Sequence, residues 1–141
     1  MNTQVLPVNE ESIALAAKLL QQGELVALPT ETVYGIAADA RNGEAVKKIF
    51  EAKGRPQDNP LIIHVPDSSW LERYCENVPP EAYALAESFW PGPLTMILPR
   101  KPIVPLRTSR AMSSRSCVVY SFARSAQRAG WSISTAASGA R

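Results

Sequence analysis

Cysteine and histidine are scarce in this sequence: Cys75, Cys117 and His64 are the only ones among 141 residues. No CxxC pair and no Cys/His cluster is present, which argues against zinc modules and disulfide-rich secreted scaffolds. No apolar run approaches the ~18 residues of a membrane span, and the polar residues 2–4 are unlike the start of a signal peptide. These absences predict a cytoplasmic protein with no membrane segment and no metal site.

Acidic residues and proline are missing from residues 106–141. All 13 Asp and Glu and all 12 prolines lie at or before Pro105, whereas the later segment holds six arginines and nine of the 13 serines. This change in composition predicts a domain over 1–105 followed by a Ser/Arg/Ala-rich tail over 106–141. Only 117–122 in the tail has the apolar pattern of a strand, so we expect the rest to be poorly ordered.

Helical and strand patterns alternate through residues 1–105, which predicts a two-layer α/β domain. Apolar residues recur at the spacing of one helical face, and short apolar runs are bracketed by proline or glycine, as in buried strands. Residues 30–42 are polar and contain the turn residues of a loop. Ser69 and Glu72 have the spacing of a capping box. The expected helices lie between Asn9 and Gly23, over 44–52, after Ser69, and over 80–89 with Ala82, Leu85, Ala86 and Phe89 inward; the expected strands cover 25–28, 61–65 and 94–98.

The sequence PTETVYG at 29–35 places polar side chains directly beyond the first expected strand. Ligands bind at strand ends in open α/β sheets, which makes Thr30 a candidate contact. An ordinary transition from strand to turn explains the same residues, so spacing alone leaves both interpretations open.

Lys53, Gly54 and Arg55 follow the second expected helix and also have two interpretations. A basic last turn, a glycine and then a proline are typical of a helix C-terminus. Alternatively, the Lys53 ammonium and the Arg55 guanidinium form a phosphate clamp. Asn59, just before the next strand, is then either a turn residue or an amide contact for the same ligand.

His64 lies near the carboxyl end of the expected strand 61–65. A single histidine in an apolar strand is more often a hydrogen-bonded structural residue than a ligand contact. Its position also fits a substrate contact at the site reached by Thr30, provided that the two strands are neighbours.

Three long segments occur in one order: PTETVYG at 29–35, FEAKGRPQDNPLIIHV at 50–65 and FWPGPLT at 89–95. Together they resemble the YrdC-type threonylcarbamoyl-AMP synthases over residues 10–100. The resemblance implies a twisted mixed sheet packed with helices, similar to double-stranded-RNA-binding domains, with a deep, positively lined cavity. It also implies a nucleotidyltransferase that condenses L-threonine, bicarbonate or CO₂, and ATP, with Mg²⁺ on the phosphates, for threonylcarbamoyladenosine modification of tRNA. By motif position, Thr30 and His64 contact threonine, and Lys53, Arg55 and Asn59 contact ATP.

The resemblance ends near residue 101, because the family's later VRxP and SxN segments are missing. We therefore expect a sheet that is incomplete at its C-terminal end and has an unpaired edge. The tail is either the product of a frameshift or truncation, or a basic segment that binds tRNA or double-stranded RNA. Three functions stay open: the synthase, with tRNA-modification proteins as partners; a non-catalytic nucleotide- or RNA-binding module; and a carbamoyl-handling domain of a larger enzyme.

Overall fold

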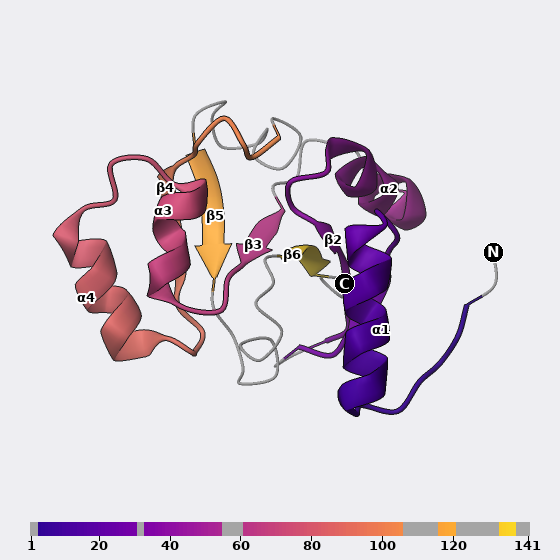
Figure 1. The fold of residues 1–141 in the computed structure, drawn as a ribbon. Coiled ribbons are helices and arrows are strands. Elements are labelled where there is room, and N and C mark those ends of the chain that lie inside the picture. Colours follow the sequence, from indigo (N-terminus) through magenta and orange to yellow (C-terminus); the bar gives the residue numbers. More distant parts are fainter. Residues whose placement is uncertain (1–2, 31–32, 55–60, 106–115, 121–132, 138–141) are drawn as a thin grey trace.

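The computed structural model describes residues 3–30, 33–54, 61–105, 116–120 and 133–137, which form alternating helices and strands (Figure 1). The helical elements are α1 (Glu10–Gln21), α2 (Gly43–Lys53), the 3₁₀ turn η1 (Ser68–Trp70), α3 (Leu71–Tyr74) and α4 (Pro80–Phe89). The strands are β1 (Val26–Leu28), β2 (Gly35–Asp39), β3 (Ile62–His64), β4 (Thr95–Pro99), β5 (Ser116–Tyr120) and β6 (Ile133–Ala137).

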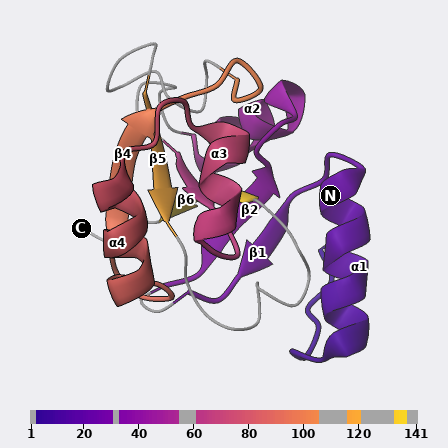
Figure 2. The same cartoon turned by 60° about the vertical axis from the view of Figure 1, so that its left-hand side comes forward.

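The strands that the structure describes make one six-stranded sheet in the order β1-β2-β6-β3-β5-β4. The β3–β5 pair is parallel, and the other neighbouring pairs are antiparallel. In both views α1 lies beside the β1–β2 end of the sheet and α4 beside the β4 end (Figures 1 and 2). The expected mixed sheet packed with helices is confirmed.

The two faces of the sheet are covered differently. Side chains of α2 pack with Ala38 and Leu61, and the buried residues of α3 and α4 pack with Ile63 and Val119. These strand positions share one face of the sheet. Alternate residues of a strand point to the same side, and directly paired residues of neighbouring strands also point to the same side as each other. On the opposite face, Leu20 of α1 packs with Ala37. We call the side of Ala37 the α1 face.

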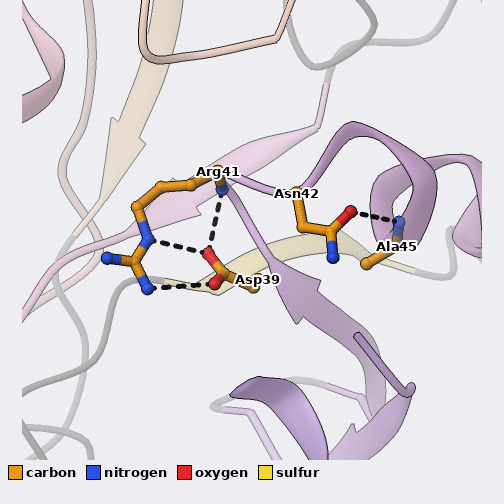
Figure 3. Close-up of polar contacts among 4 residues, drawn as sticks. All are labelled: Asp39, Arg41, Asn42 and Ala45. Atoms are coloured by element: carbon orange, nitrogen blue, oxygen red, sulfur yellow. Dashed lines mark hydrogen bonds and ion pairs between the residues drawn. The ribbon is translucent and has the colours of Figure 1, made fainter. Parts of the chain in front are cut away.

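The helix ends follow the sequence. The Asn9 side chain accepts from the Ser12 backbone N–H at 2.9 Å to start α1. The Asn42 side chain accepts from the Glu44 and Ala45 N–H groups, both at 3.1 Å, to start α2; Figure 3 shows the contact with Ala45. Gly54 ends α2 with a φ of 57°, in the left-handed region that glycine favours.

Three local expectations for residues 1–105 are wrong. Residues 35–39 form β2, although 30–42 was expected to be one loop. The short helix is capped by Asp67, whose side chain accepts from the Ser69 N–H at 2.8 Å, and not by Ser69. In α4 only the small Ala82 and Ala86 are buried, so the helix packs close on that side and leaves Leu85 and Phe89 43% and 57% exposed.

The segment after residue 105 contributes two strands to the sheet, which corrects the expectation of a sheet without its later strands. The strand expected at 117–122 is observed as β5, and it pairs with both β3 and β4. The unexpected β6 lies between β2 and β3. Non-local pairing with strands of the first 105 residues is the physical reason, and composition does not reveal it. The expectation of poor order elsewhere in 106–141 falls outside the described residues.

Helices long and apolar enough to cross a membrane do not occur in the described parts of the chain.

Candidate functional site

Thr30 lies between β1 and β2, and Lys53 is the last residue of α2. The course of the chain brings both toward the same edge of the sheet. Strand β2 runs antiparallel to β1, so Gly35 is paired with Leu28, close before Thr30. Strands β2 and β3 run in the same direction, because both are antiparallel to β6, so the chain between them, which includes α2, returns toward the edge at which β2 starts. Lys53 lies on this return path, toward the edge at which β1 ends.

Thr30 is held in a turn just beyond β1. Its backbone N–H donates to the Val33 carbonyl at 3.2 Å, and its hydroxyl donates to the same carbonyl. The Thr30 hydroxyl also accepts from the Val33 N–H at 3.2 Å. The turn interpretation of PTETVYG is thus correct, and these hydrogen bonds fix the position of the Thr30 hydroxyl oxygen.

The C-terminus of α2 shows the helix end expected from Lys53 and Gly54. The Gly54 N–H donates to the Glu51 carbonyl at 3.2 Å, and Lys53 is the last helical residue. Capping of the helix explains Gly54. Lys53 is half-buried, and its contact with a phosphate stays a prediction. Arg55 and Asn59 lie outside the described residues, between α2 and β3.

His64 is buried, with 7% of its surface exposed, at the carboxyl end of β3. In the register, His64 is paired with Ile133, which is paired with Asp39. His64 and Asp39 therefore lie on the same face of the sheet as Ala37. Leu28 packs with Ala37 on this face, and Thr30, two residues after Leu28, continues the alternation of sides along the chain. His64 and the Thr30 position therefore belong to the same α1 face of the sheet.

Strands β1 and β3 are not neighbours, so the condition set for a shared Thr30–His64 site is not met. Strands β2 and β6 lie between them, and β1 and β3 run in opposite directions. From the register, Leu28 and His64 are four residues apart along the strands, roughly 13 Å, and three strand spacings apart across the sheet, roughly 14 Å. A ligand touching both residues would have to lie over the α1 face rather than at one strand end.

The α1 face is open beyond β2 in the part of the chain that the structure describes. Helix α1 packs on β1 and β2 through Leu20. Farther along the sheet, Ile62 is half-buried and Thr95 is exposed, and Ile97 is 53% exposed. No described helix covers these strand positions, in contrast to the opposite face. The described helices thus cover the α1 face less fully than the opposite face, although His64 itself is buried.

The sequence reading missed the pair formed by Asp39 and Arg41, which lies near His64 across β6. The Arg41 guanidinium donates to both carboxylate oxygens of Asp39, at 3.1 and 3.0 Å, and the Arg41 backbone N–H donates at 2.9 Å (Figure 3). The hydrogen bond with Asp39, followed by its charge, raises the pKa of Arg41. The pair fixes the turn between β2 and α2. The sequence signal for this ion pair is an acidic residue at the end of a strand followed two residues later by a basic residue.

The described residues contain no group of three or more His, Cys, Asp and Glu side chains that could hold a metal ion. A magnesium ion needs oxygen ligands and keeps several waters, and it commonly binds through substrate phosphates. The described donor set therefore fits Mg²⁺ only as an ion that accompanies a nucleotide.

The chain belongs to the Sua5/YciO/YrdC family, whose sequence model is described as "Telomere recombination" and matches residues 18–120. The threonylcarbamoyl-AMP synthase of Bacillus subtilis is 57% identical over 100 residues, which cover 71% of this chain and 29% of that protein. The Pyrococcus abyssi enzyme of the same name is 54% identical over 98 residues, or 70% of this chain and 29% of that protein. The resemblance inferred from the three segments is confirmed, and the chain spans less than a third of these relatives' length.

Solved structures agree with the fold. Crystalline P. abyssi Sua5 complexed with L-threonine matches with a TM-score of 0.85 and 42% identity, covering 94% of this chain and 40% of that one. The E. coli YciO crystal structure matches with a TM-score of 0.77 at 21% identity, covering 92% of this chain and 65% of that one, which is a likeness in fold.

Proposed function

We propose that this chain makes threonylcarbamoyl-AMP and pyrophosphate from L-threonine, bicarbonate or CO₂, and ATP. The observation that carries the proposal is the likeness to Sua5 complexed with L-threonine, at 42% identity over a match that covers 94% of this chain. The product would serve the modification of tRNA, so the proposal includes tRNA and tRNA-modification proteins as partners and a cytoplasmic location. No observation favours the non-catalytic module over this activity.

The chemistry needs positioning and positive charge more than a covalent nucleophile. The threonine amine captures CO₂ to form a carbamate, whose oxygen attacks the α-phosphorus of ATP while the bond to the departing pyrophosphate breaks. Both partners are anions. In this proposal Lys53 and Arg55 neutralise the phosphates and Asn59 adds an amide hydrogen bond. Bound with ATP as part of the substrate, Mg²⁺ neutralises further phosphate charge.

Thr30 and His64 hold threonine in this proposal. The strand register supports the arrangement: both positions belong to the α1 face, and Lys53 lies on the return path from β2 to β3, toward the Thr30 edge. Threonine over this face and ATP toward the edge would bring the carbamate and the α-phosphate together.

The test is pyrophosphate release by the purified full chain, with each of the three substrates omitted in turn. We expect slow release that requires all three, at no more than about one-hundredth of the rate of the B. subtilis relative, because misplacement by ~1 Å costs about a hundredfold and the VRxP and SxN segments are missing. ATP binding without threonine-dependent release would overturn the proposal in favour of the module.

A pair of variants separates substrate contact from turn structure. Thr30→Val removes the hydroxyl and should raise the KM for threonine at least tenfold, on the order of one lost hydrogen bond. Thr30→Ser keeps the hydroxyl that bonds Val33 and should stay within about threefold of the unaltered chain. If both variants raise the KM for threonine equally, or if Thr30→Val raises the KM for ATP as much as the KM for threonine, Thr30 acts in the turn alone.

A further inference from the structure

The two cysteines of the chain, 42 residues apart in sequence, meet in the core on the side away from the α1 face. Their Sγ atoms are 3.5 Å apart, and each residue is only 1% exposed. Cys75 directly follows α3, and Cys117 belongs to β5. The proposed synthesis uses neither thiol, so their proximity needs a separate account.

Backbone contacts hold the two cysteines close together. The Cys75 N–H donates to the Leu71 carbonyl at 2.8 Å, and Cys75 forms a β-bridge with Arg100. Cys117 is paired with Leu98 in the neighbouring β4, and its Sγ lies 3.9 Å from the Tyr74 carbonyl oxygen. A disulfide bond is about 2.05 Å long, so the sulfurs need to approach by roughly 1.5 Å.

A surface hollow lies beside the pair, and the two thiols influence each other's ionisation. Cys75 is among the residues lining a surface hollow of about 410 Å³, together with Glu72, Glu76, Asn77, Val78 and Lys101. A hydrogen bond joins the two thiols, and either sulfur can donate it; this hydrogen bond lowers the pKa of Cys117. The same hydrogen bond and then burial raise the pKa of Cys75. The two thiols therefore titrate as a pair, in which one sulfur can hold the proton while the other is ionised.

We propose that Cys75 and Cys117 are a redox modification site, at which a peroxide joins them in an intrachain disulfide. One thiolate of the pair attacks a peroxide oxygen; the O–O bond breaks, and with one proton the products are a sulfenic acid and water. The neighbouring thiol sulfur then attacks the sulfenic sulfur, the S–S bond forms, and the second oxygen leaves as water. Hydrogen peroxide is reduced to two waters while two thiols are oxidised. The bond would fasten β5 to the chain after α3.

The test treats the reduced full chain with hydrogen peroxide and measures it by mass spectrometry and thiol titration without reductant. We expect a loss of about 2 Da per chain, a disulfide-linked peptide pair containing Cys75 and Cys117, and recovery of both thiols with dithiothreitol. Closing the loop should raise the melting temperature by roughly 10 °C. The proposal would be overturned by any of three results: both thiols stay free, the disulfide forms only between two chains, or it forms only in urea.

Cys75→Ala and Cys117→Ala serve as the matched variants. Each keeps a small apolar side chain in the core and should lose both the mass change and the rise in melting temperature on peroxide treatment. If a variant fails to fold, peptide mapping of the unaltered chain still decides whether the bond forms. A peroxide-induced thermal shift that survives in either variant would assign that shift to another modification and contradict the proposed site.

Discussion

Gly92 shows how a single missing side-chain atom fixes the turn within FWPGPLT. A Cβ at residue 92 would lie 2.3 Å from the Phe89 backbone carbonyl oxygen. Backbone atoms in this turn are also tied by the Trp90 indole N–H, which donates to the Leu94 carbonyl at 2.7 Å. Glycine is therefore required here for space, and the turn aims the chain from α4 into β4.

We expect Gly92→Ala to destabilise the chain by about 1–3 kcal/mol, because the backbone must shift to accept the new methyl group. Urea unfolding followed by circular dichroism measures the change. Gly43→Ala is the matched control: its Cβ would make ordinary contact with Pro105 at 3.7 Å, so its stability should stay equal or rise by about 0.5 kcal/mol. Equal losses in both variants would contradict the steric argument.

Arg55→Lys tests the proposed ATP contact. A guanidinium grips two phosphate oxygens at once, whereas an ammonium is a point charge, so ATP should bind about ten- to a hundredfold more weakly. Titration calorimetry with ATP measures the affinity. Arg73→Lys makes the same chemical change on α3, where the guanidinium stacks over the Trp70 ring at 4.1 Å, and should leave ATP affinity unchanged. Unaltered affinity in Arg55→Lys would return residues 53–55 to helix capping.

The candidate residues could be identified from sequence because they lie in long motifs, but their arrangement could not. Thr30, Lys53 and His64 follow from their positions in the motifs, and the parallel course of β2 and β3 puts Lys53 on the return path toward the Thr30 edge. The distance between Thr30 and His64 depends on β6 lying between β2 and β3, which is a non-local pairing. The pair of Asp39 and Arg41 was not predicted, because it becomes recognisable only once β2 is known to end at Asp39.

At the scale of elements, the start of α2 rests on one side chain. Asn42 accepts from the backbone N–H groups of Glu44 and Ala45, which have no partner within the helix; the contact with Ala45 is visible in Figure 3. Because α2 carries Lys53 toward the candidate site, this cap links a local hydrogen bond to the position of a functional residue.

We expect Asn42→Ala to lower the free energy of unfolding by about 1 kcal/mol, and Asn42→Asp to stay within about 0.5 kcal/mol of the unaltered chain, since aspartate caps equally well. Denaturant unfolding monitored by tryptophan fluorescence gives both values. A loss as large in Asn42→Asp as in Asn42→Ala would mean that the amide nitrogen, and not the capping oxygen, carries the effect.

Elements with strong local signals were predicted to within one or two residues. Helices α1 and α2 have asparagine caps and glycine beyond their ends, and β3 and β4 are apolar runs next to proline. Strand β2 was missed because Gly-Ile-Ala-Ala-Asp has one β-branched residue and few signals of a strand. Strand β6 is rich in serine, threonine and alanine, so its place in the sheet follows from its neighbours rather than from its own pattern.

At the scale of the whole molecule, β5 and β6 join three pieces of sheet that the first 105 residues leave separate. In the order β1-β2-β6-β3-β5-β4, removing β5 and β6 leaves the β1–β2 pair, β3 alone and β4 alone. An isolated two-stranded hairpin is marginally stable at best in water, and an unpaired central strand leaves its N–H and C=O groups unsatisfied. The segment that composition sets apart therefore holds the sheet together.

A chain ending at Pro105 should consequently fail to fold cooperatively. We expect its urea transition to be broad or absent and its β3 amides to exchange with solvent quickly, whereas the full chain protects β3 and β5 together. A chain ending at Tyr120 keeps the β3–β5–β4 part of the sheet and should show an intermediate, weaker transition. Removal of residues 2–6, of which those described are exposed, is the control and should leave the transition unchanged. Cooperative unfolding of the 105-residue chain at the midpoint of the full chain would show that the later strands are dispensable, and the pairing of β6 between β2 and β3 would then be wrong as an account of stability.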